Sequence, residues 1–266
     1  MEELKFDIAI VGGGIVGLAT AYKLQLKYPK LCLAVIEKED SLAFHQTGRN
    51  SGVIHSGLYY KPDSLRAKNC VDGRKQLVAF ACQNNIDIDI CGKIVLATNN
   101  IQAKKLLELK INGEKNGLKD LKILNSNELK KIEPNAAGNA ALFVPESGII
   151  DYKQTTKKFA EKITSINKKS KIILSCEVLN FNNNFLLTSK GKIYTKNNIF
   201  CAGLFSDRLA KKDNLNTNMK IVGFRGDYYK LKDSSRHKVN NLIYPVPNPE
   251  FPFLGVHLTR MTDGSI

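Results

Sequence analysis

The stretch FDIAIVGGGIVGLATAYKLQLKYPKLCLAVIEK, residues 6–38, decides the fold. Its apolar start, residues 6–11, predicts a buried strand, and three glycines spaced G-x-G-x-x-G lead from there into a helical pattern. In this arrangement Gly12 permits a tight turn, Gly14 lets the backbone approach a pyrophosphate, and Gly17 lets the helix pack closely on the strand. The N–H groups and partial positive charge at the helix N-terminus then favour phosphate.

A second apolar run, residues 31–36, leads directly into Glu37. A carboxylate at this place, about 20 residues after the glycines, can accept hydrogen bonds from ribose hydroxyls. A glycine-rich turn without a ligand is the alternative for the glycines alone. Strand, helix, second strand and acid together predict a Rossmann-like, dinucleotide-binding α/β domain.

Composition limits the remaining classes. The 266 residues suffice for one large or two modest domains, and no apolar run approaches the ~20 residues of a membrane span. We expect a cytoplasmic protein, because the first strand starts without a cationic leader or a cleavable apolar segment. The six cysteines lack C-x-x-C pairing, which predicts reduced core thiols and no metal site.

The net charge of +15 comes mainly from lysines on predicted helix faces and turns. Solvated helix faces are the simpler interpretation. Attraction to an acidic substrate, or peripheral contact with the inner face of the cytoplasmic membrane, is the open alternative. Nucleic acid is not expected as a partner, because no basic stripe interleaved with aromatic residues is present.

Residues 41–60, SLAFHQTGRNSGVIHSGLYY, have neither a strand nor a helix period. An irregular stretch of this length inside a compact domain is usually functional, and here it follows the second strand, where ligands bind in such folds. His45 and His55 bracket the loop, which suggests a site, although a lone histidine is more often structural. The loop also supplies hydrogen-bond donors and glycines that permit close backbone approach: Gln46, Thr47, Asn50, Ser51, Gly48, Gly52 and Gly57.

The segment HQTGRNSGVIHSGLYY, residues 45–60, resembles the flavin-binding loop of L-2-hydroxyglutarate dehydrogenases and oxidases, which belong to the D-amino-acid-oxidase-like class of FAD enzymes. The resemblance continues through CGKIVLAT, SGIIDY, CAGLFSDRLA, FRGDYYKL and IYPVPNPEFPFLGVHLTRMTDGSI, which begin at residues 91, 147, 201, 224 and 243. It covers essentially the whole chain.

The resemblance implies FAD as cofactor and oxidation of L-2-hydroxyglutarate to 2-oxoglutarate by hydride transfer to the flavin. It places His55 beside the flavin, where a histidine is suited to accept the hydroxyl proton near neutral pH. It also implies that the backbone of Val178 contacts the adenine and that Ala202 and Gly203 lie beside the adenosine. The full expected set of FAD contacts is Gly12, Gly14, Gly17, Glu37, Lys38, His45, Gln46, Thr47, Gly48, Asn50, Ser51, Gly52, Val53, Val178, Ala202 and Gly203.

A dicarboxylate substrate needs fixed cations, which Arg225, His257 and Arg260 can supply from two predicted strands, residues 220–231 and 253–261. The alternative for the arginines is ordinary surface charge. Hydroxyl donors are expected from Tyr59, Tyr228 and Tyr229, for which core packing is the alternative.

The change in composition along the chain predicts a discontinuous FAD-binding domain, residues 1–85 and 150–215. It also predicts an incomplete antiparallel substrate domain, residues 86–149 and 216–266. Helices are expected at residues 64–85, 101–113 and 152–167, with Asn125 and Glu128 forming a capping box. Among the expected strands are residues 86–90, 93–98, 141–144, 171–181, 185–188, 192–195 and 198–201.

Asp263-Gly264 is a strong hairpin signal close to the last residue, Ile266. Because the resembled family continues further, we expect a C-terminally truncated member with impaired activity, or one completed by a separately encoded C-terminal segment. Three alternatives stay open: an FAD enzyme for another small anion such as glycerol 3-phosphate or an amino acid, a non-catalytic remnant, and, least favoured, a nicotinamide dehydrogenase. Oxygen, a quinone and an electron carrier all stay open as electron acceptors.

Overall fold

The computed structural model describes residues 4–215, 218–248, 250 and 255–266. The chain forms two compact units: unit 1 comprises Met1–Asn50 and Tyr152–Asp227, and unit 2 comprises Ser51–Asp151 and Tyr228–Ile266. The main difference from the predicted domains is that residues 51–85 group with unit 2. The reason is packing, since Leu58 belongs to a hydrophobic core that is otherwise built from unit 2 residues.

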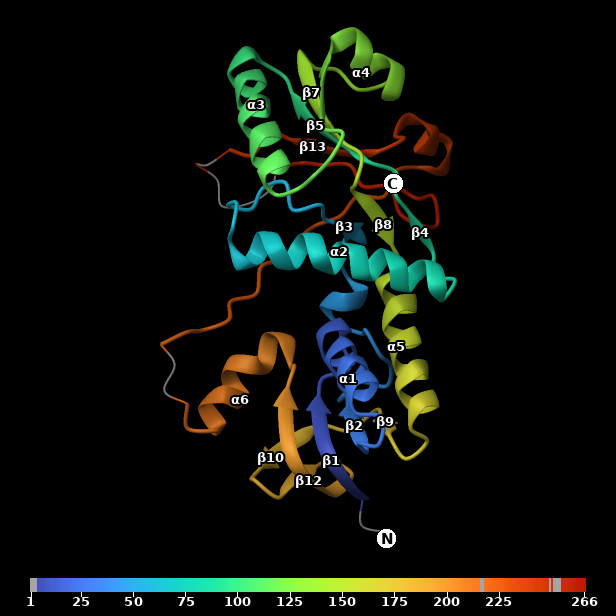
Figure 1. Cartoon of the computed structure of the whole chain (residues 1–266), viewed down its shortest axis with the longest axis vertical. Coiled ribbons are helices and arrows are strands. Elements are labelled where there is room, and N and C mark those ends of the chain that lie inside the picture. The colour runs from blue at the N-terminus through green and yellow to red at the C-terminus, as the bar shows by residue number, and fades with distance from the viewer. Residues whose placement is uncertain (1–3, 216–217, 249, 251–254) are drawn as a thin grey trace. The chain divides into compact units, whose positions relative to one another are not determined.

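Unit 1 is built on one six-stranded sheet in the order β10-β11-β12-β1-β2-β9. β1 is parallel to both β12 and β2, and β2 is parallel to β9, whereas β10, β11 and β12 form an antiparallel meander (Figure 1). This sheet confirms the predicted Rossmann-like class. The strands are β1 (Leu4–Val11), β2 (Leu33–Ile36), β9 (Lys171–Ile173), β10 (Val178–Phe181), β11 (Phe185–Thr188) and β12 (Gly191–Phe200).

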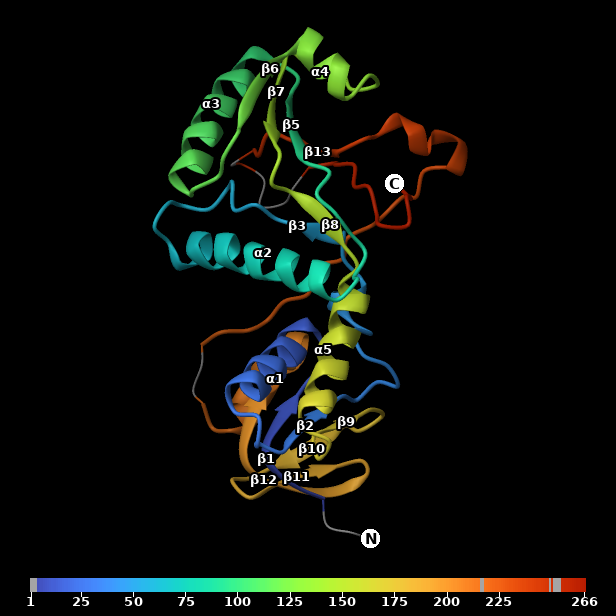
Figure 2. The ribbon, with the colours of Figure 1, turned by 45° about the vertical axis from the view of Figure 1, so that its right-hand side comes forward.

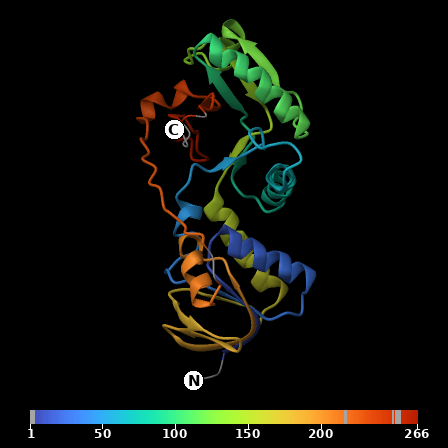
Figure 3. The ribbon, with the colours of Figure 1, turned by 90° about the vertical axis from the view of Figure 1, so that its left-hand side faces the viewer.

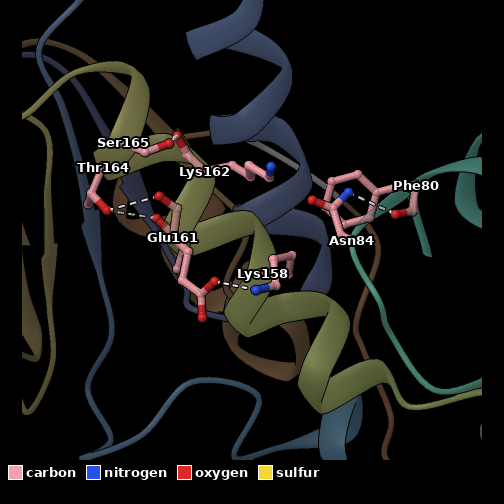
Figure 4. Close-up of polar contacts among 8 residues, drawn as sticks. Phe80, Asn84, Lys158, Glu161, Lys162, Thr164 and Ser165 are labelled. Carbon is pink, nitrogen blue, oxygen red and sulfur yellow. Dashed lines mark hydrogen bonds and ion pairs between the residues drawn. The ribbon is translucent and has the colours of Figure 1, made fainter. Parts of the chain in front are cut away.

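Two helices, α1 (Ile15–Lys27) and α5 (Tyr152–Ile166), pack against each other and contact the parallel strands of unit 1 (Figure 2). The Tyr22 and Phe159 rings meet between the helices, with their centroids 5.2 Å apart. Phe159 and Ile163 of α5 are buried, as are the polar Thr155 and Thr156, whereas its charged residues form local contacts on the surface. Lys158 pairs with Glu161 at 2.5 Å, and the Ser165 hydroxyl donates to the Lys162 carbonyl (Figure 4).

Two strand predictions in unit 1 were wrong in their bounds. The predicted strand 171–181 is two strands, because Ser175 adopts a left-handed conformation (φ +49°) and β9 pairs with β2 whereas β10 pairs with β11. The predicted strands 192–195 and 198–201 are instead the single long β12, which pairs with β11 on one side and β1 on the other. The turn η2 (Gly203–Phe205) and helix α6 (Ser206–Lys212) follow.

Unit 2 contains a four-stranded sheet in the order β13-β5-β7-β6 and a three-stranded sheet in the order β3-β8-β4. β13 is parallel to β5, and the remaining pairs in both sheets are antiparallel. The predicted strand 86–90 is shortened to β4. The strands are β3 (Val53–Ile54), β4 (Ile88–Asp89), β5 (Lys93–Ala97), β6 (Lys122–Asn125), β7 (Ala140–Val144), β8 (Gly148–Ile150) and β13 (Leu242–Pro245).

Both faces of the four-stranded sheet are covered, as alternation along its strands requires. Val95 packs with Leu106 of α3 (Asn100–Lys115), while Ile94 packs with Leu129 of α4 (Ser126–Ile132) on the opposite face. Figure 3 shows the ribbon of α3 lying along this sheet. The predicted capping box is confirmed. The Asn125 side chain accepts from the Glu128 N–H at 3.0 Å, and the Glu128 carboxylate accepts from the Asn125 N–H at 2.9 Å.

The long strands predicted at the end of the chain are wrong where the structure describes them. Residues 218–230 contain no strand, and residues 221–230 are exposed throughout. Of the predicted strand 253–261, residues 253 and 254 lie outside the described part, and Leu258 forms a single bridge to Ile243. An apolar extended segment becomes a strand only when another strand pairs with it, and no described strand pairs with residues 218–230.

The helix α2 (Leu65–Gln83) contains an exposed glycine whose replacement should change the stability of the protein. Gly73 is exposed in the middle of this helix, and a Cβ added there would have no heavy atom within 4 Å. Gly73→Ala is therefore expected to raise the free energy of unfolding by about 0.5–1 kcal/mol, because alanine loses less backbone entropy in a helix. Urea denaturation measures this. Gly113→Ala in α3 is the contrasting control: its Cβ would lie 2.7 Å from a Leu121 methyl, so it should destabilise.

Candidate active site

The edge of the unit 1 sheet brings the predicted cofactor segments together. Because β1 is parallel to β2 and β12, and Val11 lies opposite both Ile36 and Phe200, the three strands end at the same edge. The segments that leave this edge begin with Gly12, Glu37 and Cys201. Ligands of doubly wound sheets bind at the carboxyl ends of the strands, so this edge is the candidate cofactor site.

The glycine turn after β1 tolerates no side chain at two of its positions. Gly12 has a φ of +121°, and a Cβ there would lie 2.3 Å from the carbonyl oxygen of Cys201. A Cβ on Gly17 would lie 2.0 Å from the Gly12 carbonyl oxygen. Gly14 is different, because its φ is −83° and the nearest atom to an added Cβ is the Thr47 hydroxyl at 3.1 Å. Packing within the protein therefore explains Gly12 and Gly17, but it does not by itself explain Gly14.

The N-terminus of α1 is suited to an anionic group. Its first turn contains no acidic residue, and its N-cap, Gly14, supplies no side-chain hydrogen bond. The Thr47 hydroxyl accepts from the Ile15 N–H at 3.0 Å, which fixes the loop after β2 against the start of the helix. A helix start behind a glycine turn, with no acidic residue in its first turn and no side chain on its N-cap residue, fits the pyrophosphate of a dinucleotide.

Glu37 is the buried acid of this edge, with 8% of its surface exposed. One carboxylate oxygen accepts from the Gly13 N–H at 2.6 Å and the other from the Glu39 N–H at 3.0 Å. The carboxylate thus ties the end of β2 to the glycine turn. Each oxygen keeps a further lone pair with which a ribose hydroxyl could be bound.

The loop after β2 is held by its own polar groups. The Asn50 amide donates to the carbonyls of Gln46 and Thr47 at 2.9 and 2.8 Å, across the turn η1 (Gln46–Gly48). A Cβ on Gly48 would lie 2.2 Å from the Ala43 carbonyl oxygen. These residues position the loop, and their direct contact with a cofactor stays a prediction.

Five further predicted contacts also lie in unit 1. The Lys38 ammonium lies 4.3 Å from the centre of the Phe205 ring, and the His45 imidazole bonds to the Glu39 carboxylate at 2.7 Å. Gly203 has a φ of +54° with open space around its Cα, next to Ala202. Val178 lies in β10, opposite Thr188 of β11.

Ser51, Gly52 and Val53 belong to unit 2, unlike the other predicted cofactor residues. Val53 is buried in β3 opposite Ile149, and the Gly52 carbonyl accepts from the Ile150 N–H at 2.8 Å. Gly52 needs its glycine for a φ of +64°. The structure gives these three residues a role in building unit 2, and their cofactor role stays a prediction.

The loop after β3 carries His55 and Tyr59, and α3 holds this loop in place. The side-chain amide of Asn112 donates to the carbonyls of Leu58 and Tyr60 at 2.5 and 2.9 Å. Asn116, the C-cap residue of α3, donates to the Gly57 and Tyr60 carbonyls. Side-chain amides on a rigid helix thus fix the backbone on both sides of Tyr59.

Lys93 was not predicted as a site residue, yet it is the buried cation of unit 2, with 1% of its surface exposed. Alternation along β5 places it on the same face as Val95, and the register places Tyr244 of β13 opposite Val95. The Lys93 ammonium lies 4.5 Å from the centre of the Tyr59 ring and 5.3 Å from that of Tyr244. Burial lowers its pKa to about 8.

His55 is electrostatically coupled to the same group. Although the side chain is exposed, surrounding protein atoms displace much of its water, and this desolvation lowers the pKa of His55 to about 4. The electrostatic influence of Lys93 and His257 acts in the same direction. The imidazole is therefore neutral near pH 7, which is the form that can accept a proton.

The predicted substrate residues are only partly brought together. The His257 ring stacks on the Tyr244 ring with centroids 4.6 Å apart. His257 therefore belongs to the same group of residues as His55, Tyr59 and Lys93, and this group is called here the Lys93 cluster. Arg260, also in unit 2, is held by Asp89 at 3.5 Å and by the Asn240 carbonyl at 3.3 Å. Tyr228 and Tyr229 are exposed.

Arg225 is not part of unit 2, which contains the Lys93 cluster. It belongs to unit 1, where it is exposed and pairs with Asp227 at 2.7 Å. The sequence signal for Lys93 was present but weak: a lysine that heads the otherwise apolar run KIVLA. Only the register and the covered face show that this lysine is buried.

Other classes of site find no support in the described residues. They contain no group of three or more His, Cys, Asp or Glu side chains that could hold a metal ion. No described helix combines the length and the apolar character that crossing a bilayer demands. The six cysteines are free thiols.

Comparison with protein families identifies what the chain is similar to. Residues 7–266 match the family described as FAD dependent oxidoreductase. The chain is 46% identical, over 99% of its length, to an L-2-hydroxyglutarate dehydrogenase of Indibacter alkaliphilus, and 42% identical, over 98%, to one of Escherichia coli K12. It spans 67% and 62% of the length of these relatives.

Solved structures agree on the fold. The L-alpha-glycerophosphate oxidase of Mycoplasma pneumoniae, solved with FAD bound, superposes with a TM-score of 0.79 at 27% identity, over 100% of this chain and 70% of that one. The glycine oxidase of Geobacillus kaustophilus superposes with a TM-score of 0.81 at 17% identity, over 98% of this chain and 70% of that one.

Proposed function

The chain belongs to the FAD-dependent oxidoreductases, and within them to the L-2-hydroxyglutarate dehydrogenase family, and on this premise we propose that it oxidises L-2-hydroxyglutarate to 2-oxoglutarate with FAD as the hydride acceptor. One observation carries the proposal: in unit 2, a histidine that is neutral near pH 7 is coupled to a buried lysine. A neutral base and a fixed cation are what an anionic 2-hydroxy acid requires.

The residues of unit 1 would hold the cofactor. The glycine turn and the N-terminus of α1 would bind the pyrophosphate, and Glu37 would accept hydrogen bonds from the ribose. Lys38, His45, Ala202 and Gly203 would line the adenosine side of the same sheet edge. This proposal is supported by the strand ends, by the start of α1 with no acidic residue and no N-cap side chain, and by the hydrogen bond that Glu37 accepts from the Gly13 N–H.

FAD, when bound, accepts the two electrons and the hydrogen that leave the hydroxyl-bearing carbon as hydride. The hydroxyl proton passes to an imidazole nitrogen of His55, and the carbon–oxygen bond becomes the carbonyl of the product. His55 can accept this proton because desolvation, and to a smaller extent the electrostatic influence of Lys93 and His257, lower its pKa and keep it unprotonated. The two carboxylates take no part in bond changes and serve to orient the substrate.

Two measurements on the purified chain test this proposal. Reconstitution with FAD should produce the absorption bands of oxidised flavin, and a protein that takes up no FAD would contradict the cofactor assignment. Dye-coupled assays should then show L-2-hydroxyglutarate oxidised in preference to glycerol 3-phosphate, glycine and L-proline. Preference for one of these other substrates would leave the FAD assignment standing but overturn the proposed substrate.

A further inference from the structure

Lys93 occupies an energetically unfavourable position for a residue with a purely structural role. It is 1% exposed, and none of the ion pairs formed among the described residues includes it. A buried charge without a counter-charge costs several kcal/mol, in general, and is retained mainly where something compensates for it. Its two cation–π contacts, with Tyr59 and Tyr244, compensate only in part, since each is worth ~0.5–2 kcal/mol.

A second buried group beside Lys93 also lacks a partner. The hydroxyl of Tyr59 is fully buried and makes no hydrogen bond. A buried hydroxyl without a partner costs about 1–3 kcal/mol, so such groups are usually paired in the functional state. An ammonium only donates hydrogen bonds and a phenol hydroxyl can donate one, so a single acceptor, most simply an anion, would satisfy both groups.

We propose that Lys93 and Tyr59 bind the substrate carboxylate adjacent to the hydroxyl-bearing carbon, and that this pair selects 2-hydroxy acids over simple alcohols. The inference rests on the proposed function, because it concerns the same unit 2 site. His55 is the exposed member of the Lys93 cluster, so the anion is expected to enter beside it. A carboxylate on Lys93 then places the neighbouring hydroxyl next to the base that takes its proton.

The pair has the right chemistry for this one carboxylate. A charge-assisted hydrogen bond from an ammonium is about twice as strong as a neutral one, and the low polarity around Lys93 strengthens it further. The arginines predicted for this role are already engaged: Arg260 with Asp89, and Arg225 with Asp227. Lys93 has no such carboxylate partner among the described residues.

The first test is the affinity of the FAD-loaded protein for 2-oxoglutarate, measured by isothermal titration calorimetry at pH 7. Lys93→Met keeps the length of the side chain and removes its charge, and it is expected to weaken binding about 10- to 150-fold. Lys104→Met, the same change at an exposed position of α3, is the matched control and should leave binding unchanged. An affinity of Lys93→Met within twofold of the wild-type value would overturn the proposal.

The second readout separates a binding role from a structural one. Raising the pH from 7 to 9.5 neutralises a lysine whose pKa is about 8, so wild-type affinity should fall by about 30-fold, whereas Lys93→Met should change little. The titratable groups that face Lys93 are His55, Cys70, Tyr59, Tyr244 and His257, and all are retained in the variant. A wild-type to variant ratio that is the same at both pH values would show that Lys93 acts through the fold alone.

Failure of this inference is distinguishable from failure of the proposed function. If the wild-type protein oxidises L-2-hydroxyglutarate and Lys93→Met has an unchanged KM, the proposed function is supported. The assignment of Lys93 as the group that binds the substrate carboxylate is then wrong. If the wild-type protein prefers glycerol 3-phosphate, the proposed function falls, and the selection of 2-hydroxy acids by Lys93 falls with it. Thermal unfolding without ligand should show an equal or higher Tm for Lys93→Met, because the variant removes an uncompensated buried charge. A Tm well below that of the wild type would contradict this reading.

Discussion

Replacing His55 by alanine is expected to lower the turnover of L-2-hydroxyglutarate by about 100- to 10,000-fold, while FAD binding changes little. The expected loss is large because the hydroxyl proton must leave as the hydride departs, and His55 is the neutral base of the Lys93 cluster. The cofactor is expected to be unaffected because the glycine turn, the helix start and Glu37 all belong to unit 1. Steady-state kinetics and flavin absorbance measure the two quantities on one sample.

The pH dependence follows from the direction of the His55 shift. A base works only when it is unprotonated, and the pKa of His55 is lowered to about 4. The wild-type kcat/KM should therefore stay level from about pH 7 down to about pH 5 and fall at lower pH, without the decline near pH 6.5 that an ordinary histidine would give.

His237→Ala is the matched control, since His237 is exposed in η3 (Asp233–Lys238) of the same unit. It should leave both turnover and FAD binding unchanged. Near-normal turnover of His55→Ala would show that the proton leaves by another route, and His257 would then be the next residue to replace.

The parts of the site that follow local rules could be predicted from the sequence. The structural roles of Gly12 and Gly17 depend on a strand, a turn and a helix that are contiguous in the chain. The structure confirms that neither position tolerates a Cβ. Glu37 follows in the same way from the length of one strand–helix–strand unit. The capping box at Asn125 needed only three neighbouring residues.

The parts that depend on pairing between distant segments could not be predicted. Residues 220–231 contain β-branched and aromatic residues that favour a strand, but a strand exists only with a partner strand, and composition does not reveal one. Lys93 illustrates the converse, because a lysine at the start of a strand is normally exposed. Its burial depends on β13, which pairs with β5 from about 150 residues further along the chain, and on the loop that α3 holds against it.

The three glycines of the fingerprint allow the cofactor site to be tested separately from the fold. Gly14→Ala is expected to lower the free energy of unfolding of the FAD-free protein only slightly, because its φ of −83° suits alanine and the added Cβ meets only the Thr47 hydroxyl at 3.1 Å, a tight contact that a small shift of this side chain relieves. The same methyl should obstruct a pyrophosphate that approaches the turn, and so weaken FAD binding by about 5- to 150-fold, which corresponds to 1–3 kcal/mol of steric conflict.

Gly12→Ala and Gly17→Ala are expected to fail in a different way, and more severely. Their Cβ atoms would lie 2.3 and 2.0 Å from the carbonyl oxygens of Cys201 and Gly12, so the strand, the turn and the helix would have to separate. Gly12→Ala also imposes a positive φ on alanine, a strain of about 1–3 kcal/mol. Both variants should therefore lose stability by urea denaturation and contain almost no flavin as purified, whereas Gly73→Ala, the same substitution in open space, should retain it. Wild-type FAD affinity in Gly14→Ala would show that no phosphate approaches that position, and the N-terminus of α1 would lose its place in the cofactor site.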